Sequence, residues 1–507
     1  MKKTLLYFTA ILFLYSCSPA TKSFSNKDDG RIQVNFIQVN DVYEIAPLSN
    51  GNEGGMARIA SIKQKYVERN PNSFLVMAGD FLSPSVYNSL KYQGKSIRGK
   101  QMVEAMNAAG FDFVIFGNHE FDIKEAELQE RINESQFQWI SSNSFHKKND
   151  KSLPFEKVNS TGSVPFPVSF IKTVKDEDGT VAKIGFIGLT LPFNKASYVI
   201  YTDVFATAKD LYNKLKDSVD AVIAITHQSM EEDEELAREI PGLAAIMGGH
   251  EHDQRYAKIN GVPITKAMAN AKNAFVVRLS INKNNRKTRV FTKLETLDET
   301  IVLDNATNSV VQKWVGIAEA NYGSLGFEAG KVVLTESAPL DGRESEIRNH
   351  PTNLTRLIVK AMANAAPNAD VVIMNAGSIR VDDVLQMPVT QYDIIRTLPF
   401  GGSIREIEMK GSLLTKILEQ GVRNKGIGGY LHVNENISFN AAANTWKIGD
   451  TPVDILKTYR VALPDFLFTG GESNLEYLKP GNPDVVKVLA DPSGDIRLAI
   501  IKYLGKK

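Results

Sequence analysis

Residues 113–122 read FVIFGNHEFD, in which a short apolar run ends abruptly in a cluster of polar side chains. The run over residues 113–116 has the length and the aromatic and β-branched content of a buried strand. Four other apolar runs end in the same manner, at residues 34–39, 74–77, 221–225 and 243–247. They alternate with longer amphipathic stretches, which is the pattern of an α/β fold. Because open α/β sheets place their sites at the C-terminal ends of strands, we expect one site where these runs end.

The residues that follow the predicted strands are mostly of metal-ligand type. Four of the seven histidines in the chain stand there, namely His119, His227, His250 and His252. Three further candidates are Asp41, Asp80 and Asn118. One histidine alone is more often structural, but the group together supplies the carboxylate, amide and imidazole donors that hold two divalent or trivalent cations.

Two cations suit the hydrolysis of a phosphate ester. One ion can generate hydroxide from bound water, while both neutralise the charge that the phosphoryl group carries in the transition state. A carboxylate must then bridge the ions, and Asp80 is the natural bridge. The preceding Gly79 lets the backbone turn tightly and approach the ions closely.

Five short motifs carry a resemblance to a known family. They are GGMAR at 54–58, GD at 79–80, GNHEFD at 117–122, TH at 226–227 and GHEH at 249–252. In these motifs the chain resembles the calcineurin-like metallophosphoesterase domain of the bacterial 5′-nucleotidase and UDP-sugar hydrolase family, over residues 31 to about 297. The resemblance implies an α/β fold with a four-layer β-sandwich flanked by helices in the N-terminal half, and a separate α/β nucleotide-binding domain in the C-terminal half.

The resemblance also implies a role for each ligand-type residue. Asp80 bridges the two ions, which are divalent or of mixed valence, such as Zn, Mn or Fe. One ion is completed by Asn118, His227 and His250, and the other by Asp41 and His252. The pair of His119 with Asp122 stabilises the transition state or the leaving group and binds no metal.

Tyr43 departs from the family pattern, which has Asp-x-His where this chain has Asp41-Val42-Tyr43. One interpretation is that its phenolate is a metal ligand, which would favour a ferric ion, as in purple acid phosphatases. The other is that Tyr43 packs beside the site and the first ion is held by other donors. A third hypothesis is a degenerate, inactive site, although every other expected ligand type is present.

The second half contains NL at 353–354, NAGSIR at 375–380, LPFGG at 398–402, and DFL at 465–467 ahead of GGE at 470–472. In these motifs it resembles the C-terminal domain of the same family, over residues 330–478. The substrate-binding positions that match are Asn375, Arg380 and Phe400, with Arg348 a further candidate against which Arg343 competes. Arg380 would grip phosphate with its planar donor fork, and Phe400 would stack on the base. The second stacking ring of the family is absent from the motif at 470–474, so Tyr477 or Tyr430 takes its place or the base site is altered.

The chain divides into five predicted segments. An apolar run after Lys2 and Lys3 ends near the only cysteine, so residues 1–17 resemble a lipoprotein signal that ends at a lipidated Cys17. A lone cysteine in an exported chain has no internal disulfide partner, though a simple secretory signal is the alternative. We expect a tether at 18–30, a catalytic domain at 31–300, a linker helix at 301–329 and a substrate domain at 330–507.

The sequence therefore predicts an exported, membrane-anchored phosphoesterase, periplasmic or on the cell surface, that acts on nucleotides or other small phosphate esters. Lys and Arg number 59 against 58 for Asp and Glu, so no net field favours a nucleic acid as partner. One alternative is a phosphoesterase for UDP-sugars or 2′,3′-cyclic nucleotides. Another is a surface lipoprotein that binds nucleotides without turnover.

Overall fold

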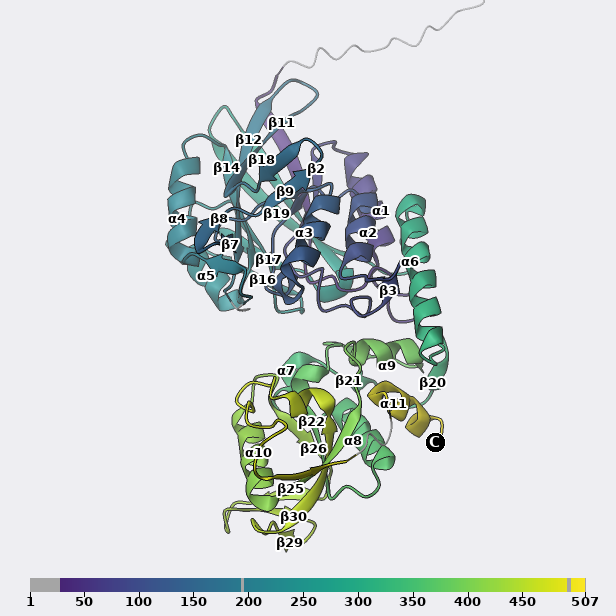
Figure 1. The fold of residues 1–507 in the computed structure, drawn as a ribbon. Coiled ribbons are helices and arrows are strands. Elements are labelled where there is room, and N and C mark those ends of the chain that lie inside the picture. The colour runs from purple at the N-terminus through teal and green to yellow at the C-terminus, as the bar shows by residue number, and fades with distance from the viewer. Residues whose placement is uncertain (1–27, 193–195, 490–493, 507) are drawn as a thin grey trace, which may run out of the picture.

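The computed structural model describes residues 28–192, 196–489 and 494–506, which form two domains joined by one long helix (Figure 1). The predicted export signal, Cys17 and most of the tether lie outside these residues. Within the described part of the chain, no helix has both the length and the apolar character needed to cross a bilayer.

The N-terminal domain is built on two six-stranded sheets. The first has the order β19 (Lys287–Thr296), β18 (Asn273–Asn282), β1 (Arg31–Val39), β2 (Ser73–Met77), β5 (Phe113–Val114) and β6 (Gln138–Trp139). The second has the order β11 (Ser169–Lys175), β12 (Val181–Thr190), β14 (Ala221–His227), β15 (Ala245–Gly249), β17 (Val262–Lys266) and β16 (Arg255–Ile259). The five predicted strands are all present, although β5 ends at Val114 and β15 begins at Ala245.

The two sheets pack face to face through apolar side chains that alternate along the strands. Phe36 of β1 meets Phe186 of β12 with ring centroids 5.5 Å apart. Helices α1 (Met56–Val67), α2 (Lys100–Ala109) and α3 (Glu125–Glu134) cover the outer face of the first sheet. Helices α4 (Val204–Leu215) and α5 (Met230–Glu239) cover that of the second. This arrangement confirms the predicted four-layer sandwich, because a sheet buried on both faces needs helices outside it.

Helix α6 (Asn305–Ser324) leaves this domain and lies within the segment 301–329 that we expect to be a linker helix. Asp304 caps its first turn by accepting a hydrogen bond from the backbone of Thr307. Trp314 is fully buried against α1 and α2, and its indole donates a hydrogen bond of 2.9 Å to Glu104. The helix is thus fixed to the N-terminal domain along one side.

The C-terminal domain has a five-stranded mixed sheet in the order β26 (Leu431–Val433), β22 (Val371–Asn375), β30 (Thr458–Pro464), β25 (Ile404–Lys410) and β31 (Val485–Val488). Helices α8 (Asn353–Ala365) and α11 (Ile496–Leu504) pack on one face of the sheet, and α10 (Gly411–Arg423) packs on the other. Helix α9 (Gln391–Thr397) lies on the side that faces the catalytic domain (Figure 1).

Shorter elements complete both domains. In the first they are β3 (Lys91–Tyr92), β4 (Lys95–Ser96), β7 (Ser144–Lys148), β8 (Lys151–Leu153), β9 (Glu156–Asn159), β10 (Gly162–Pro165) and β13 (Val199–Tyr201). In the second they are β20 (Val332–Leu334), β21 (Leu340–Asp341), α7 (Glu344–Ile347), β23 (Val384–Leu385), β24 (Val389–Thr390), β27 (Ile437–Asn440), β28 (Thr445–Ile448) and β29 (Thr451–Pro452).

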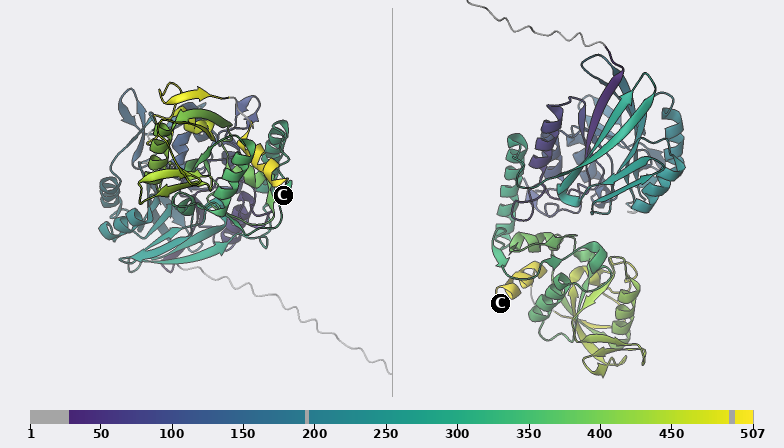
Figure 2. Two further views of the ribbon diagram at one scale, coloured as in Figure 1. Left: turned by 90° about the horizontal axis from the view of Figure 1, so that it is seen from below. Right: turned by 180° about the vertical axis from the view of Figure 1, so that it is seen from behind.

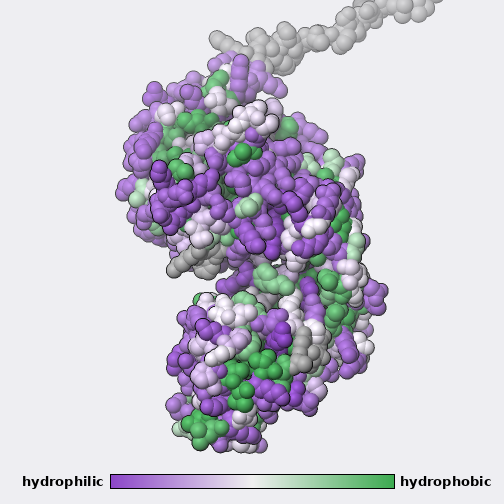
Figure 3. Space-filling view, in the orientation of Figure 1, coloured by the Kyte–Doolittle hydropathy of each residue, from purple (hydrophilic) through white to green (hydrophobic). Residues whose placement is uncertain are grey.

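The two domains face each other, with α6 connecting them along one side (Figure 2). The surface is hollowed between the domains on the side away from α6 (Figure 3). Polar contacts cross the gap, and Lys272 of the first domain pairs with both carboxylate oxygens of Asp383 of the second at 2.8 Å. The C-terminal ends of the parallel strands of the first domain therefore open toward the second domain.

Candidate active site

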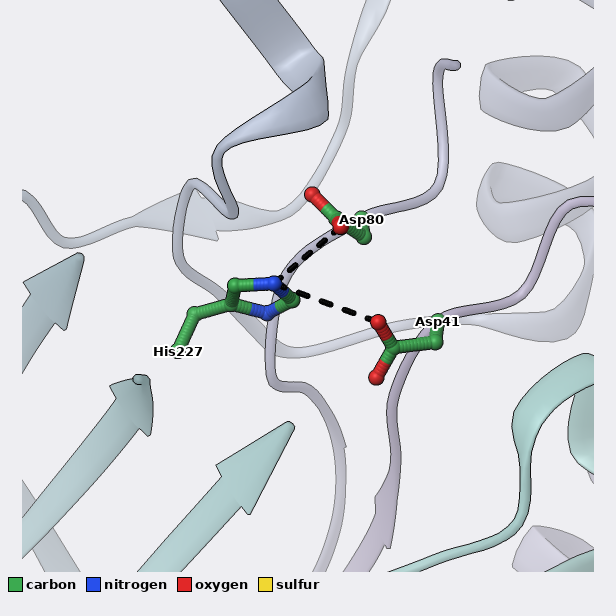
Figure 4. A group of neighbouring side chains, drawn as sticks. All are labelled: Asp41, Asp80 and His227. Atoms are coloured by element: carbon green, nitrogen blue, oxygen red, sulfur yellow. Dashed lines mark ion pairs between the residues drawn. The ribbon is translucent and has the colours of Figure 1, made fainter. Parts of the chain in front are cut away.

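Three buried side chains meet where the strands of the two sheets end. Asp41 follows β1, Asp80 follows β2, and His227 is the last residue of β14. His227 Nε2 lies 3.1 Å from Asp80 Oδ2 and 3.9 Å from Asp41 Oδ1 (Figure 4). One ligand atom from each of the three lies within 4.8 Å of the others. Two buried carboxylates and an imidazole at this spacing are a donor set that fits a metal cation.

The backbone at the site is held in an uncommon conformation. The φ angle is 53° at Asp41, 55° at Asp80, 97° at His250 and 58° at His252. Residues other than glycine rarely adopt these angles, and such outliers cluster at functional sites. At Gly79 a Cβ would lie 2.6 Å from both Gly117 N and His227 Nδ1, so only glycine fits this turn.

Hydrogen bonds behind the ligands orient them. His227 Nδ1 lies 2.8 Å from the carbonyl oxygen of Ala78, which leaves Nε2 directed at the carboxylates. The buried carboxylate of Glu120 accepts backbone hydrogen bonds from Asp80, Phe81, Leu82 and Gly117 at 2.6 to 3.0 Å. Glu120 thus ties the turn after β2 to the turn after β5. Sequence reasoning quoted Glu120 within its motif but gave it no role.

The charges of Asp41 and His250 suit metal binding. Burial opposes ionisation of Asp41, yet His227 and His252 hold its pKa well below the ordinary value. Burial, with the neighbouring His227, lowers the pKa of His250 to about 3, so this imidazole is neutral at physiological pH. The backbone N–H of His250 also donates to Asp41 Oδ2 at 2.9 Å. A charged carboxylate and a neutral imidazole are the protonation states in which these residues bind cations.

His227 and His252, by contrast, must each lose a proton to bind a metal. Burial opposes their protonation. Even so, Asp80 and Asp41 raise the pKa of His227 to about 9. Asp382 and Asp41 raise the pKa of His252 well above its ordinary value.

Tyr43 points its hydroxyl into this group. The oxygen lies 2.9 Å from His252 Nε2 and 3.4 Å from both Asp41 Oδ1 and Asp80 Oδ2. Burial, together with Asp80 and Asp41, raises the pKa of the phenol well above 10. The hydroxyl therefore lies among the predicted ligands, within hydrogen-bonding reach of three of them.

The predicted catalytic pair is formed on the short 3₁₀ helix η1 (His119–Asp122), which follows β5. His119 Nδ1 lies 2.6 Å from Asp122 Oδ2, and its backbone N–H donates to Asp80 Oδ1 at 2.8 Å. His119 Nε2 faces Arg380 Nη2 of the C-terminal domain at 3.3 Å. Asn118, immediately before His119, is buried. The structure therefore brings a predicted phosphate-binding arginine to the predicted catalytic histidine.

The other predicted substrate residues lie in the C-terminal domain near Arg380. Asn375 is fully buried, donates to Glu472 Oε2 at 2.6 Å and accepts from Ser378 Oγ at 2.7 Å. Arg348 pairs with Glu344, and burial together with the charge of Arg380 lowers its pKa to about 10. Its competitor Arg343 pairs with Asp341 at the surface instead. Arg348 thus lies close enough to Arg380 for the two charges to interact.

Two exposed aromatic rings stand on neighbouring segments of this domain. Phe400 is 65% exposed and Phe466 is 44% exposed. Asp465 joins the two segments, because its backbone N–H donates to Ser403 O at 2.9 Å and its carboxylate accepts from Ser403 N at 3.0 Å. Exposed rings on two joined segments are a platform for an aromatic ligand.

The sequence suggests Tyr477 or Tyr430 for the second ring and gives Phe466, which stands in the motif at 465–467, no role. Lys416 Nζ lies 3.8 Å from the centroid of the Tyr477 ring. The ring centroids of Tyr430 and His432 are 5.3 Å apart. Phe466 instead packs over the predicted glycine loop, since a Cβ at Gly471 would lie 3.1 Å from its ring. The run Asp465-Phe466-Leu467 directly before that loop was the available signal.

A small pocket opens between the domains beside these groups. Both domains line it, through residues that include Tyr43, His252, Arg380, Asp382 and Pro399. The backbone N–H of Arg380 donates to Thr397 O at 2.9 Å, which links the Arg380 loop to the segment that carries Phe400. The arrangement can bind a small anion between the metal-ligand group and Arg380.

Comparison with known proteins gives a family model for each domain. Residues 34–254 match the calcineurin-like phosphoesterases. Residues 332–479 match the C-terminal domain of 5′-nucleotidases.

Relatives align with most of this chain. A 5′-nucleotidase from Bos taurus is 26% identical over 472 residues, which cover 83% of this chain and 78% of that protein. The trifunctional nucleotide phosphoesterase YfkN from Bacillus subtilis is 25% identical over 498 residues, covering 88% of this chain and 33% of that protein. The crystal structure of a 5′-nucleotidase precursor from Thermus thermophilus has the same fold, with a TM-score of 0.70 at 20% identity over 94% of this chain and 96% of that one.

Proposed function

We propose that this chain, which belongs to the family of calcineurin-like phosphoesterases with a 5′-nucleotidase C-terminal domain, hydrolyses the phosphate ester of 5′-nucleotides with bound metal ions. The observation that carries the proposal is the buried group of Asp41, Asp80 and His227, beside which His119 meets Arg380 of the second domain. The family supplies the reaction class, and the second domain supplies a place for the nucleotide.

The ligand set that we propose follows from the donors at the strand ends. Asp80 would be shared by two ions, with Asn118, His227 and His250 on one side and Asp41, Tyr43 and His252 on the other. The neutral His250 and the charged, buried Asp41 fit this use. When bound, the ions would supply a hydroxide nucleophile and neutralise phosphoryl charge. The donors suit Zn, Mn or Fe, including a mixed-valence pair.

His119 and Arg380 would act on the phosphate itself. Arg380 offers a planar fork of N–H donors that can bind two phosphate oxygens at once. His119, oriented by Asp122 at 2.6 Å, would stabilise charge on the phosphoryl group or pass a proton to the leaving oxygen. Because the two side chains meet at 3.3 Å, an anion between the domains would contact both.

Phe400 and Phe466 would hold the base, with Asn375 and Arg348 near the remainder of the nucleotide. Stacking of a base on an aromatic ring contributes about 1–3 kcal/mol and tolerates different bases. We therefore expect the site to accept several nucleotides and to prefer those with a base over simple phosphate esters.

The site of action that we propose is outside the cytoplasm. The basic and apolar N-terminal sequence and the single Cys17 support export followed by lipid attachment, in the periplasm or at the cell surface. Labelling with a radioactive fatty acid would test the anchor, because Cys17→Ala should abolish incorporation and release the protein from membranes. A membrane-bound Cys17→Ala protein would contradict it.

A substrate panel tests the assignment of the base site. Phe400→Ala and Phe466→Ala should each lower kcat/KM for AMP about 5- to 150-fold, which corresponds to the loss of 1–3 kcal/mol of stacking. Hydrolysis of a small aryl phosphate should change little, since neither ring touches the metal ligands. Phe291→Ala, which removes an exposed ring from β19 in the other domain, is the matched control.

An equal loss on both substrates would show that the rings are structural. UDP-glucose and 2′,3′-cyclic AMP belong in the same panel because YfkN is named a trifunctional nucleotide phosphoesterase. If either compound is hydrolysed faster than AMP, that compound is the preferred substrate, and the enzyme is still a phosphoesterase.

A further inference from the structure

One short segment of the C-terminal domain presents three side chains to the catalytic domain. Arg380 faces His119, Asp382 contacts His252, and Asp383 pairs with Lys272. Sequence reasoning assigned a role to Arg380 and none to Asp382 or Asp383. The contact of Asp382 is the unusual one, because its partner is a predicted metal ligand.

Asp382 is held from two sides. One carboxylate oxygen contacts Nδ1 of His252, and the other accepts a hydrogen bond from the backbone N–H of Glu344 at the start of α7. The φ angle of Asp382 is 36°, which places its backbone in the left-handed region. The opposite nitrogen of His252, Nε2, faces Tyr43 Oη at 2.9 Å and Asp41 Oδ1 at 3.4 Å. The imidazole therefore spans from a carboxylate of one domain to the ligand group of the other.

We propose that Asp382 is a positioning residue, which fixes the tautomer and the orientation of His252 for the ion shared with Asp41. The inference rests on the proposed two-metal function. A histidine that binds a metal through one ring nitrogen usually donates the other N–H to a carboxylate or carbonyl, and loss of that partner costs about 10- to 100-fold in metal affinity. Asp382 has the geometry of such a partner.

The two ions would then differ in the residues that orient their histidine ligands. His227, assigned to the other ion, is oriented by the carbonyl of Ala78 at 2.8 Å within its own domain. His252 is oriented by Asp382, which belongs to the other domain. Affinity for the ion held by Asp41 and His252 thus depends on the contact of Asp382 with His252, whereas affinity for the ion held by His227 does not.

Equilibrium dialysis of the full-length protein with Mn²⁺, and separately with Zn²⁺, tests the inference. Asp382→Asn should weaken one of two binding events about 10- to 100-fold and leave the other at its wild-type value. Asp382→Glu, which keeps the carboxylate, should recover much of the affinity. In Co²⁺-loaded protein the visible absorption bands should change in Asp382→Asn, because they report the ligand geometry of the ion.

Lys272→Met is the matched control, since it removes an ion pair across the same gap without touching His252. It should leave both affinities and the cobalt spectrum unchanged, and Asp383 would keep Arg396 as a partner at 3.1 Å.

If Asp382→Asn binds both ions as tightly as wild type, the inference is wrong while the proposed function stands. Equal weakening by Lys272→Met would also overturn it, because domain contact in general would then be the cause. A wild-type protein that binds no metal would overturn the proposed function and the inference together.

Discussion

Tyr43 is the residue at which this chain differs most from its family pattern. Its hydroxyl lies within 3.4 Å of both Asp41 and Asp80 and 2.9 Å from His252. Burial and the neighbouring carboxylates raise the pKa of this phenol, so it stays protonated when no cation is bound. A strongly Lewis-acidic ion reverses this preference, because a cation at the site is the largest local charge. As a ligand, the Tyr43 phenolate would therefore favour Fe³⁺ for the ion held with Asp41.

Iron-loaded, air-oxidised protein should be coloured, since a ferric phenolate absorbs visible light by charge transfer. Tyr43→Phe should bleach that absorption and reduce phosphate release. Tyr66→Phe, which removes another buried hydroxyl that is bonded to Glu295, should keep the colour. Colourless iron-bound wild type, with full turnover and both ions retained in Tyr43→Phe, would identify Tyr43 as a packing residue.

His119 lies beside the ligand group but contacts Asp122 and Arg380 through its ring. His119→Ala should therefore lower kcat about 10²- to 10⁴-fold, the usual contribution of a positioned acid or base, while metal content stays at the wild-type value. Elemental analysis beside steady-state kinetics makes the comparison. Loss of an ion in this variant would show that His119 is a metal ligand.

At the scale of elements, the site depends on the turns that end β1, β2, β5, β14 and β15. The apolar runs and the polar residues after them were enough to predict all five strands and the convergence of Asp41, Asp80 and His227. Parallel strands with short turns leave few other places for these residues. Gly79 and Gly117 belong to the same signal, because a side chain at either would collide with the facing turn.

The contacts that the sequence did not predict join segments that are distant along the chain. Asp382 reaches His252 across the domain gap, and Phe466 joins the segment of Phe400 through Asp465 and Ser403. No local periodicity encodes either pairing, since both depend on how the second domain folds and faces the first. The place of Tyr43 among the ligands needed side-chain positions as well.

A buried network behind the histidine loop offers a stability test at this scale. Lys266, at the end of β17, contacts Asp233 of α5 at 3.0 Å, Glu251 at 2.5 Å and the carbonyl oxygen of Gln228 at 2.6 Å. Lys266 is 1% exposed, and Glu251 stands between His250 and His252. The network thus ties the loop of two predicted ligands to the sheet.

Lys266→Met should lower the free energy of unfolding by about 3–5 kcal/mol, because it leaves buried carboxylates without a cation. Chemical denaturation would measure the loss. Lys283→Met, which removes the more exposed pair with Asp220, should cost no more than about 1 kcal/mol. A loss below about 1 kcal/mol in Lys266→Met would mean that the network is neutral in the fold.

At the scale of the whole molecule, each domain supplies what the other lacks. The catalytic domain holds the carboxylates and imidazoles, and the second domain supplies Arg380, the exposed rings and Asp382. Helix α6 is packed along the catalytic domain, so the second domain is attached on one side while the opposite side stays open (Figure 3). A nucleotide can enter that side and contact both domains at once.

The central claim is that this chain hydrolyses nucleotide phosphate esters with two ions that share Asp80. The most direct test is elemental analysis of the purified protein together with phosphate release from 5′-AMP, in wild type, Asp80→Ala and Asp210→Ala. We expect wild type to hold two ions per chain and to release phosphate. Asp210→Ala, which changes only an exposed carboxylate on α4, should do the same. Asp80→Ala should lose both the ions and the phosphate release. Metal-replete wild type that binds AMP without releasing phosphate, or an Asp80→Ala protein that keeps its turnover, would contradict the claim.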